Sequence, residues 1–244
     1  MSIVPICSAY VLPATLWAMA TSWTRLERLS PQIGVLTLDR PERRNALSVA
    51  LRDEVTEYLA LVADDPELMV LVITGAGDVF CAGFDLAEFD QAADNPEFAA
   101  RLWASSDRYH DAVAQCPVIT IAAVNGPAIA GGFDLAVLCD LRVASSTARF
   151  AHPEYTFGDV VYGPLHDLVG GALARDLCMT GRVLSAEAAL AHGLVSAVVD
   201  PGDVRVAALE LAGRVARADR PALLRTKAKA LARAREAGGR TLHR

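Results

Sequence analysis

The sequence has few of the features that stabilise secreted or membrane proteins. Its five cysteines are widely spaced, with no C-x-x-C pair, and aromatic residues make up only 6% of the chain. This pattern argues against a disulfide framework or a zinc site and favours reduced thiols in a cytoplasmic protein. No uncharged apolar run of roughly 18 residues occurs after residue 24, so no transmembrane helix is expected there.

Positive charge and the common catalytic motifs are also scarce. The chain carries 23 Lys and Arg against 29 Asp and Glu, a net charge of −6, which disfavours a general electrostatic interaction with nucleic acid. It contains no P-loop, no G-x-S-x-G nucleophile elbow and no H-E-x-x-H zinc motif. A dinucleotide fingerprint fails as well, because Phe80 stands where the third glycine after Gly75 and Gly77 is required.

What is present indicates an ordinary folded domain. The chain has 244 residues, 53% hydrophobic and 21% charged, which excludes intrinsic disorder and allows a sizeable core. Residues 1–24 have no charged side chain, and Pro5 and Pro13 interrupt their apolar run. A signal peptide needs a positive start and an unbroken apolar segment. We therefore expect a loose N-terminal extension, with Met19 as a candidate initiator.

Hydrophobic periodicity alternates between strand and helix along the rest of the chain. It predicts strands at 33–39, 69–74, 118–124, 141–144, 148–151 and 194–199, and helices at 47–63, 97–115, 131–138, 166–180, 185–193, 203–218 and 221–237. Such alternation is typical of an α/β fold with a largely parallel sheet. We predict one domain, with a core at 25–200 and a helical C-terminal region at 201–244.

Two glycine-containing segments each follow a predicted buried strand, at Phe80–Leu86 and Asn125–Leu135. Small residues leave the backbone open to a ligand. Gly131 and Gly132 fall in the first turn of a predicted helix, where N–H groups have no partner within the helix and can stabilise a developing oxyanion. Taken alone, each segment is better explained by glycines that permit close packing and turning.

Two acids lie near these segments. Asp134 is three residues into the glycine-led helix, and Glu154 follows His152 and Pro153 after a short strand. Singly, each is explained as a capping charge or a loop acid. Together with two oxyanion-type segments, they point to acid–base chemistry beside a polarised carbonyl. His152 and Glu154 are also metal-ligand types, but two residues do not make a metal site.

At these residues the sequence resembles the crotonase (enoyl-CoA hydratase/isomerase) superfamily. The resemblance covers about Ile33 to Leu231 and is carried by Asp39–Leu47, Phe80–Leu86, Asn125–Asp140 and Leu184–Val195. It implies a crotonase-like spiral of ββα units with a helical C-terminal region, here shorter than usual for the family. It also implies trimers or dimers of trimers that bind acyl-CoA thioesters and stabilise an enolate.

The resemblance implies a role for each candidate site residue. The oxyanion donors would be the backbone N–H groups of Phe84 and Gly131, and the hydratase carboxylates would be Asp134 and Glu154. The path of the CoA moiety would be lined by Arg43, Arg44, Ala46, Ala82, Asp85 and Leu86. No metal and no separate cofactor are implied, because coenzyme A enters as part of the substrate.

Several departures from the family pattern leave alternatives open. Asp134 is one methylene shorter than the hydratase glutamate, and Tyr162 stands where dienoyl-CoA isomerases carry a further aspartate. Phe84 replaces a small residue and would narrow the acyl channel. The leading hypothesis is hydration of a 2-enoyl-CoA, a lyase reaction. The alternatives are a double-bond isomerase that uses Glu154 alone and a catalytically weak acyl-CoA-binding protein.

Overall fold

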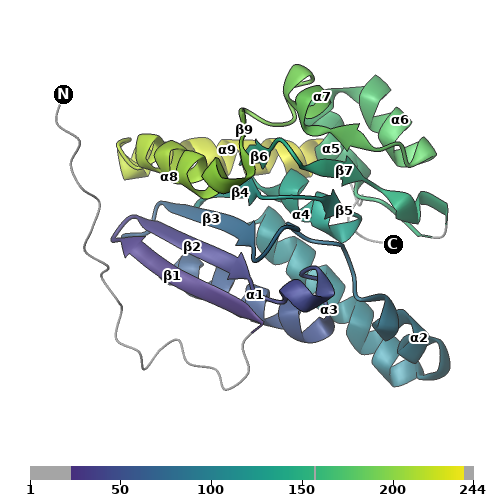
Figure 1. The fold of residues 1–244 in the computed structure, drawn as a ribbon. Helices are drawn as coiled ribbons and strands as arrows, with labels where there is room; N and C mark the ends of the chain where they lie inside the picture. Colours follow the sequence, from purple (N-terminus) through teal and green to yellow (C-terminus); the bar gives the residue numbers. More distant parts are fainter. Residues whose placement is uncertain (1–22, 157, 239–244) are drawn as a thin grey trace.

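The computed structural model describes residues 23–156 and 158–238, and a six-stranded sheet runs through its centre (Figure 1). Its strands are β1 (Thr24–Ser30), β2 (Ile33–Leu38), β3 (Val70–Gly75), β4 (Ile119–Val124), β6 (Leu141–Ser145) and β9 (Val198–Val199), in the order β1-β2-β3-β4-β6-β9. β1 is antiparallel to β2, and the remaining neighbours are parallel. The predicted α/β class with a largely parallel sheet is confirmed.

Helices cover both faces of this sheet. Along β3, Leu71 and Ile73 belong to the larger core, which contains apolar residues of α1 (Val49–Asp64) and α3 (Pro96–Ala114). The alternate residues Val70 and Val72 belong to a second core with residues of α8 (Val204–Val215). Successive strand residues face opposite sides, so a strand covered on both sides is continuously apolar, as the sequence of β3 is.

Polar side chains cap several helices. Ser48 begins α1 by accepting a hydrogen bond from the N–H of Leu51, and Asn95 begins α3 in the same way. Asp85 caps α2 (Leu86–Asp94), and Ser185 caps α7 (Ala186–Ala191). The remaining α-helices are α4 (Gly131–Leu138), α5 (Tyr162–Val169), α6 (Gly171–Thr180) and α9 (Arg220–Gly238). Such caps satisfy N–H groups that have no partner within the helix.

A small second sheet lies next to α4. It consists of β5 (Ala128–Ile129), β7 (Arg149–Ala151) and β8 (Leu184–Ser185), in the order β5-β7-β8. An isolated parallel bridge joins Cys81 to Ala128, so the segment after β3 runs beside β5. This pairing brings the two glycine-containing segments of the sequence together.

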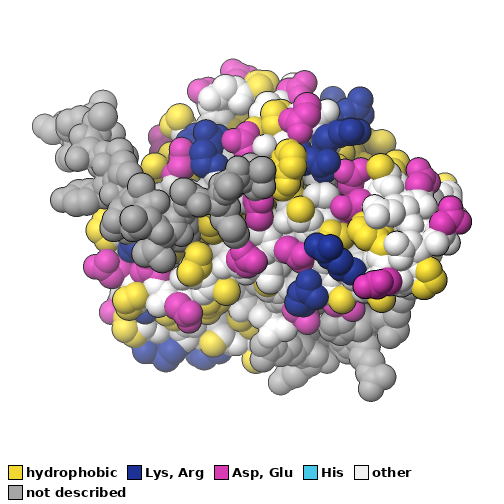
Figure 2. All heavy atoms as spheres, turned by 90° about the horizontal axis from the view of Figure 1, so that it is seen from below, with side chains coloured by type: hydrophobic (Ala, Val, Ile, Leu, Met, Phe, Trp, Pro, Cys, Tyr) yellow, Lys and Arg dark blue, Asp and Glu magenta, His cyan; other side chains and the backbone are white. Residues whose placement is uncertain are grey.

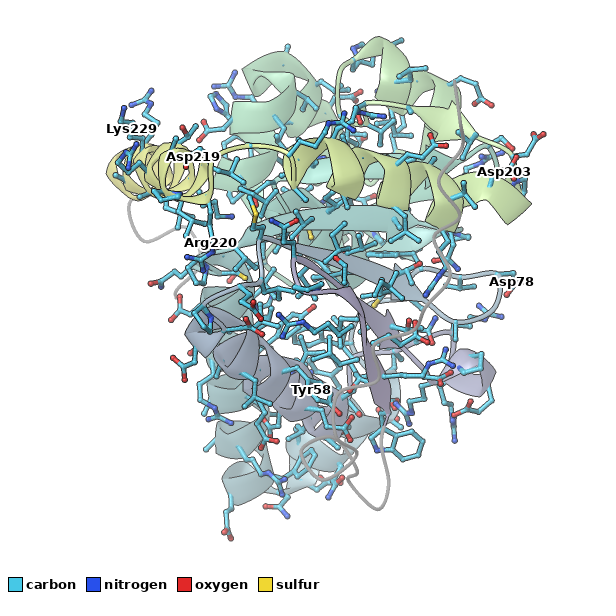
Figure 3. The ribbon with its side chains drawn as sticks, turned by 90° about the vertical axis from the view of Figure 1, so that its left-hand side faces the viewer. Tyr58, Asp78, Asp203, Asp219, Arg220 and Lys229 are labelled. Carbon is cyan, nitrogen blue, oxygen red and sulfur yellow. The ribbon has the colours of Figure 1, made fainter. Side chains whose placement is uncertain are left out.

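The C-terminal helices pack onto the central body. α8 contacts β3, β4 and β6, and α9 contacts α5. Lys227 on α9 is 4% exposed, and its Nζ lies 2.6 Å from both carboxylate oxygens of Asp140, the residue before β6. Lys229, two residues along, is exposed (Figure 3). The charges on the face shown in Figure 2 are mixed in sign.

Some expected elements differ in the structure. The predicted helix at 166–180 is two helices, because Gly170, at φ +78°, ends α5 and starts α6. The predicted strand at 194–199 is reduced to Val198–Val199. The N–H of Leu194 instead donates to the carbonyl of Ala189 on α7, and its carbonyl accepts a hydrogen bond from the Arg142 side chain. β1 and α2 were not predicted. The expected extension lies almost wholly outside the described residues.

Two further features concern the described chain alone. None of its helices is long and apolar enough to cross a membrane. Cys81, Cys116, Cys139 and Cys178 are buried free thiols, in agreement with the expected absence of disulfides among them, and Cys7 lies outside the described residues.

Candidate active site

Two asparagines hold together the loops that follow the central strands. The side-chain amide of Asn45 donates to the carbonyls of Ala76 and Val79, and its oxygen accepts from the N–H of Arg40. Asn125, after β4, accepts from the N–H of Gly75 and donates to the carbonyl of Gly77. The loops after β2, β3 and β4 therefore form one connected surface at the carboxyl edge of the parallel sheet.

The backbone N–H groups of Phe84 and Gly131 lie in adjacent segments. A Cβ on Gly83 would come within 3.2 Å of the nitrogen of Gly131, and one on Gly131 would come within 3.0 Å of the Phe84 ring. Among the backbone hydrogen bonds that the described chain forms outside its regular helices and strands, none has the N–H of Phe84 or of Gly131 as its donor. Gly131 is also the first residue of α4, where the helix dipole favours negative charge. The predicted pair is thus brought together with free donors.

The residue before each of these donors has an unusual backbone conformation. Gly83 has φ +88°, and Ala130 has φ +53° with ψ −127°. A non-glycine residue in such a conformation costs of order 1–3 kcal/mol and is typical of functional sites. Gly132 is constrained differently, because a Cβ there would lie 2.2 Å from the carbonyl oxygen of Cys81. The absence of a side chain at Gly132 therefore permits the close approach of α4 to the segment that contains Phe84.

The residues expected along the CoA path come from two neighbouring segments. The N–H of Ala82 donates to the carbonyl of Arg44, and Leu47 forms a bridge with Phe84. The full set from the first segment is Arg43 and Arg44, both exposed, and Ala46, which is buried; that from the second is Ala82, Asp85 and Leu86. Asp85 caps α2 and pairs with Arg40 at 2.8 Å, so its carboxylate is already bonded within the protein. Contact with CoA stays a prediction for all six.

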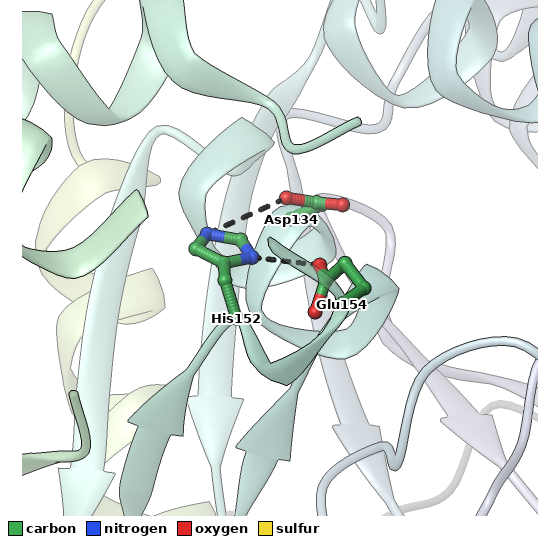
Figure 4. A group of neighbouring side chains, drawn as sticks. All are labelled: Asp134, His152 and Glu154. Atoms are coloured by element: carbon green, nitrogen blue, oxygen red, sulfur yellow. Dashed lines mark hydrogen bonds and ion pairs between the residues drawn. The ribbon is translucent and has the colours of Figure 1, made fainter. Parts of the chain in front are cut away.

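Asp134, His152 and Glu154 form one buried cluster, shown in Figure 4. His152 follows β7 and is fully buried, and its ring stacks on Phe133 with 4.6 Å between ring centroids. His152 Nδ1 lies 2.9 Å from Glu154 Oε1, and Nε2 lies 3.8 Å from Asp134 Oδ1. Both predicted catalytic carboxylates therefore converge on a histidine that sequence reasoning considered only as a metal ligand.

Burial dominates the electrostatics of this cluster. The pKa of Asp134 is raised to about 7, mainly by burial; the charge of His152 and the N–H of Val161 oppose this rise, and the charge of Glu154 adds to it. For His152, burial alone would lower the pKa, but the hydrogen bond to Glu154 and the charges of both carboxylates raise it overall. Around neutral pH, the cluster can therefore hold and release a proton.

The same three side chains are the candidate metal ligands of the described chain. Their ligand atoms lie within 4.8 Å of one another. Ligands of a tetrahedral zinc ion bond at about 2.0–2.2 Å, which requires closer spacing, and a structural site needs four of them. The direct hydrogen bond between His152 and Glu154 also satisfies two of the atoms involved. A hydrogen-bonded cluster fits the geometry better than a metal site, and the absence of a metal stays a prediction.

Sequence reasoning gave no catalytic or positioning role to two residues that lie at this candidate site. His152 is marked only by its place two residues before Glu154, at the end of a short strand. Arg40 binds both Asp85 and the carbonyl of Ala46, and so fixes the loop that carries three of the predicted CoA residues.

A cavity of about 490 Å³ lies away from this candidate site. It is formed between the β1–β2 turn and the start of α9, and Arg220 is among its lining residues (Figure 3).

Comparison with known proteins identifies the family of this chain. A family model described as enoyl-CoA hydratase/isomerase matches residues 28–243. The chain belongs to the enoyl-CoA hydratase/isomerase family. It is 38% identical over 204 residues to a putative enoyl-CoA hydratase of Thermus thermophilus, covering 82% of this chain and 81% of that protein. A probable enoyl-CoA hydratase of Mycobacterium bovis is 37% identical over 186 residues, covering 74% and 70%.

Solved structures of this enoyl-CoA hydratase/isomerase family share the fold. An enoyl-CoA hydratase from Bacillus anthracis superposes with a TM-score of 0.79 at 31% identity, covering 85% of this chain and 81% of that one. A monofunctional enoyl-CoA isomerase from Mycobacterium smegmatis gives 0.76 at 28% identity, covering 91% and 98%. The crotonase-like fold and the family expected from the sequence are confirmed, whereas the choice between hydration and isomerisation is not made by similarity.

Proposed function

We propose that this protein hydrates the double bond of a 2-enoyl-CoA thioester, with Asp134 and Glu154 as the catalytic carboxylates. The observation that carries the proposal is their convergence beside two free backbone donors. Oδ1 of Asp134 and Oε2 of Glu154 are buried without a hydrogen-bond partner. Asp134 lies one helical turn from Gly131, so the acid and the oxyanion donor share a rigid support.

The proposed reaction uses each of these groups. Water adds its oxygen to C3 of the enoyl chain while one carboxylate takes a proton from it, and the other carboxylate delivers a proton to C2 or orients the water. The N–H groups of Phe84 and Gly131 stabilise the enolate oxygen that develops on the thioester. Arg43, Arg44, Ala46, Ala82, Asp85 and Leu86 line the path of the CoA moiety in this proposal.

The test follows the loss of the conjugated enoyl-thioester absorbance with a short 2-enoyl-CoA. We expect turnover by the wild type and a loss of at least about 10²-fold in kcat for Glu154→Gln, because a general acid–base group typically contributes 10²–10⁴-fold. Bound acyl-CoA that raises the Tm without any turnover would instead indicate a catalytically weak binding protein.

Isomerisation is the second candidate, because Asp134 is short and its pKa of about 7 leaves it partly protonated at neutral pH. A one-base isomerase needs only Glu154 to move a proton along the chain. Asp134→Asn separates the two reactions: a hydratase loses turnover, whereas the isomerase keeps its turnover of a 3-enoyl-CoA.

The proposed setting follows the family resemblance. It is a homotrimer or a dimer of trimers in the cytoplasm, without a nucleic-acid or membrane partner and with no cofactor beyond the CoA of the substrate. Light scattering on the purified protein tests the assembly, and a monomeric mass at assay concentration would contradict it.

A further inference from the structure

Three of the buried polar atoms without a partner in the described chain belong to one cluster. They are Asp134 Oδ1, His152 Nε2 and Glu154 Oε2. Leaving such an atom unsatisfied costs about 1–3 kcal/mol, so three together indicate a site shaped for a small polar guest. A buried water molecule needs two to four polar partners, and this cluster provides three.

The imidazole of His152 has little freedom to move. The residue is 0% exposed, its ring is stacked on Phe133, and Nδ1 is held by Glu154 at 2.9 Å. These contacts fix the direction of Nε2. The 3.8 Å between Nε2 and Asp134 Oδ1 is too long for a direct hydrogen bond. A polar contact longer than about 3.5 Å is one that a water molecule beside the two atoms can mediate.

We propose that His152 is a positioning residue of the hydration reaction, which fixes the Glu154 carboxylate through Nδ1 and holds the attacking water through Nε2 opposite Asp134. The inference rests on the proposed function and deepens it. An imidazole whose Nδ1–H donates to Glu154 directs Nε2 towards the water and holds it by one hydrogen bond. One proton of the water passes to a carboxylate, its oxygen bonds to C3, and His152 ends the step unchanged.

This role explains how a shorter acid can serve at position 134. A displacement of about 1 Å at a reacting group can cost roughly 10²-fold in rate. Asp134 is a methylene shorter than glutamate, and the imidazole supplies a second fixed contact for the water on the side that the shorter acid leaves open. The water is then held by three groups from α4, the segment after β7 and the adjoining 3₁₀ turn (Pro153–Thr156).

The titratable neighbours of the cluster are few. Burial raises the pKa of Cys178 on α6 to about 11 and that of Cys81 to about 12, and it raises the pKa of Tyr109 on α3 well above its usual value. All three stay neutral around pH 7. The charge of His152 lowers the pKa of Asp134, so removing the imidazole shifts the ionisation of Asp134 to higher pH.

The experiment compares His152→Gln and His152→Leu with the wild type, and uses His192→Gln at an exposed position as the matched control. With a short 2-enoyl-CoA, we expect kcat to fall about 10–100-fold in His152→Gln and further in His152→Leu, which has no polar atom. KM should change less than about threefold, because the contacts that bind the substrate equally in the ground state and the transition state are unchanged. The ionisation step of kcat/KM near pH 7 should move upward, and His192→Gln should match the wild type.

Several outcomes overturn the proposal. If the wild type hydrates the substrate and both His152 variants keep its kcat and pH profile, His152 has no positioning role although the proposed function stands. A fall in kcat with an unmoved pH profile assigns His152 a merely structural role and also overturns it.

A measurement that needs no His152 variant covers the case in which those variants fail to fold and the case in which the protein does not hydrate enoyl-CoA. Imidazole nitrogen NMR should show that Nδ1 of His152 keeps its proton through the titration and that the state of Nε2 responds to Glu154→Gln. A bare Nδ1 overturns the proposal. If the protein turns over no enoyl-CoA, the proposed function fails, and a protonated, Glu154-coupled Nδ1 still supports the arrangement of the cluster.

Discussion

Replacing Asp134 by asparagine should make the protein more stable at alkaline pH. Asp134 is 6% exposed, and burial raises the pKa of its carboxyl group to about 7 from an ordinary 3.8. At 1.36 kcal/mol per pH unit, this difference in pKa corresponds to about 4 kcal/mol. The free energy of unfolding falls by this amount when Asp134 ionises in the folded protein. Its contribution to the free energy of unfolding is fully present below about pH 4, declines as the pH rises, and is lost above about pH 7.

Asparagine has nearly the same shape and does not ionise, so Asp134→Asn escapes this loss. We expect it to exceed the wild type by about 2–4 kcal/mol in free energy of unfolding at pH 8, with the difference vanishing near pH 4. Urea unfolding at a series of pH values measures it. The control is Asp107→Asn, which removes a charge at an exposed position of α3. A difference that is independent of pH, or a variant less stable than the wild type at pH 8, would refute the reasoning.

Two structural predictions concern packing around the site and the C-terminal helix. Gly132→Ala should destabilise the protein by about 1–3 kcal/mol and reduce activity, because the added Cβ lies 2.2 Å from the Cys81 carbonyl oxygen; thermal unfolding with a Tm equal to that of the wild type would contradict this. Lys227→Met should cost about 3 kcal/mol, because it leaves the Asp140 carboxylate without its cation. Lys229→Met, at an exposed position of the same helix, should change denaturant unfolding little, and equal effects of the two would overturn the assignment.

The regular elements were predictable where a single physical signal governs them. The buried strands β3 and β4 are short runs of β-branched residues, and α1 combines apolar spacing with Ser48 at its start. The failures have local causes. Gly170 divides a helix whose periodicity continues across it, and the apolar segment that begins at Leu194 is buried without pairing as a strand.

The candidate site was predictable only in part. Resemblance to a family marked Asp134 and Glu154, and the structure brings these two carboxylates together. The role of His152 depends on ring stacking and on distances between segments that lie apart in the sequence, which no local pattern encodes. The backbone strain at Ala130 was equally hidden, because alanine gives no signal of a positive φ.

The most direct test of the central claim is mass spectrometry of the product formed from a short 2-enoyl-CoA in heavy-oxygen water. Hydration predicts an acyl-CoA that has gained one water with solvent oxygen at C3, and predicts that Glu154→Gln forms it far more slowly. A product of unchanged mass whose double bond has moved, or product formation that is indifferent to Glu154→Gln, would contradict the account.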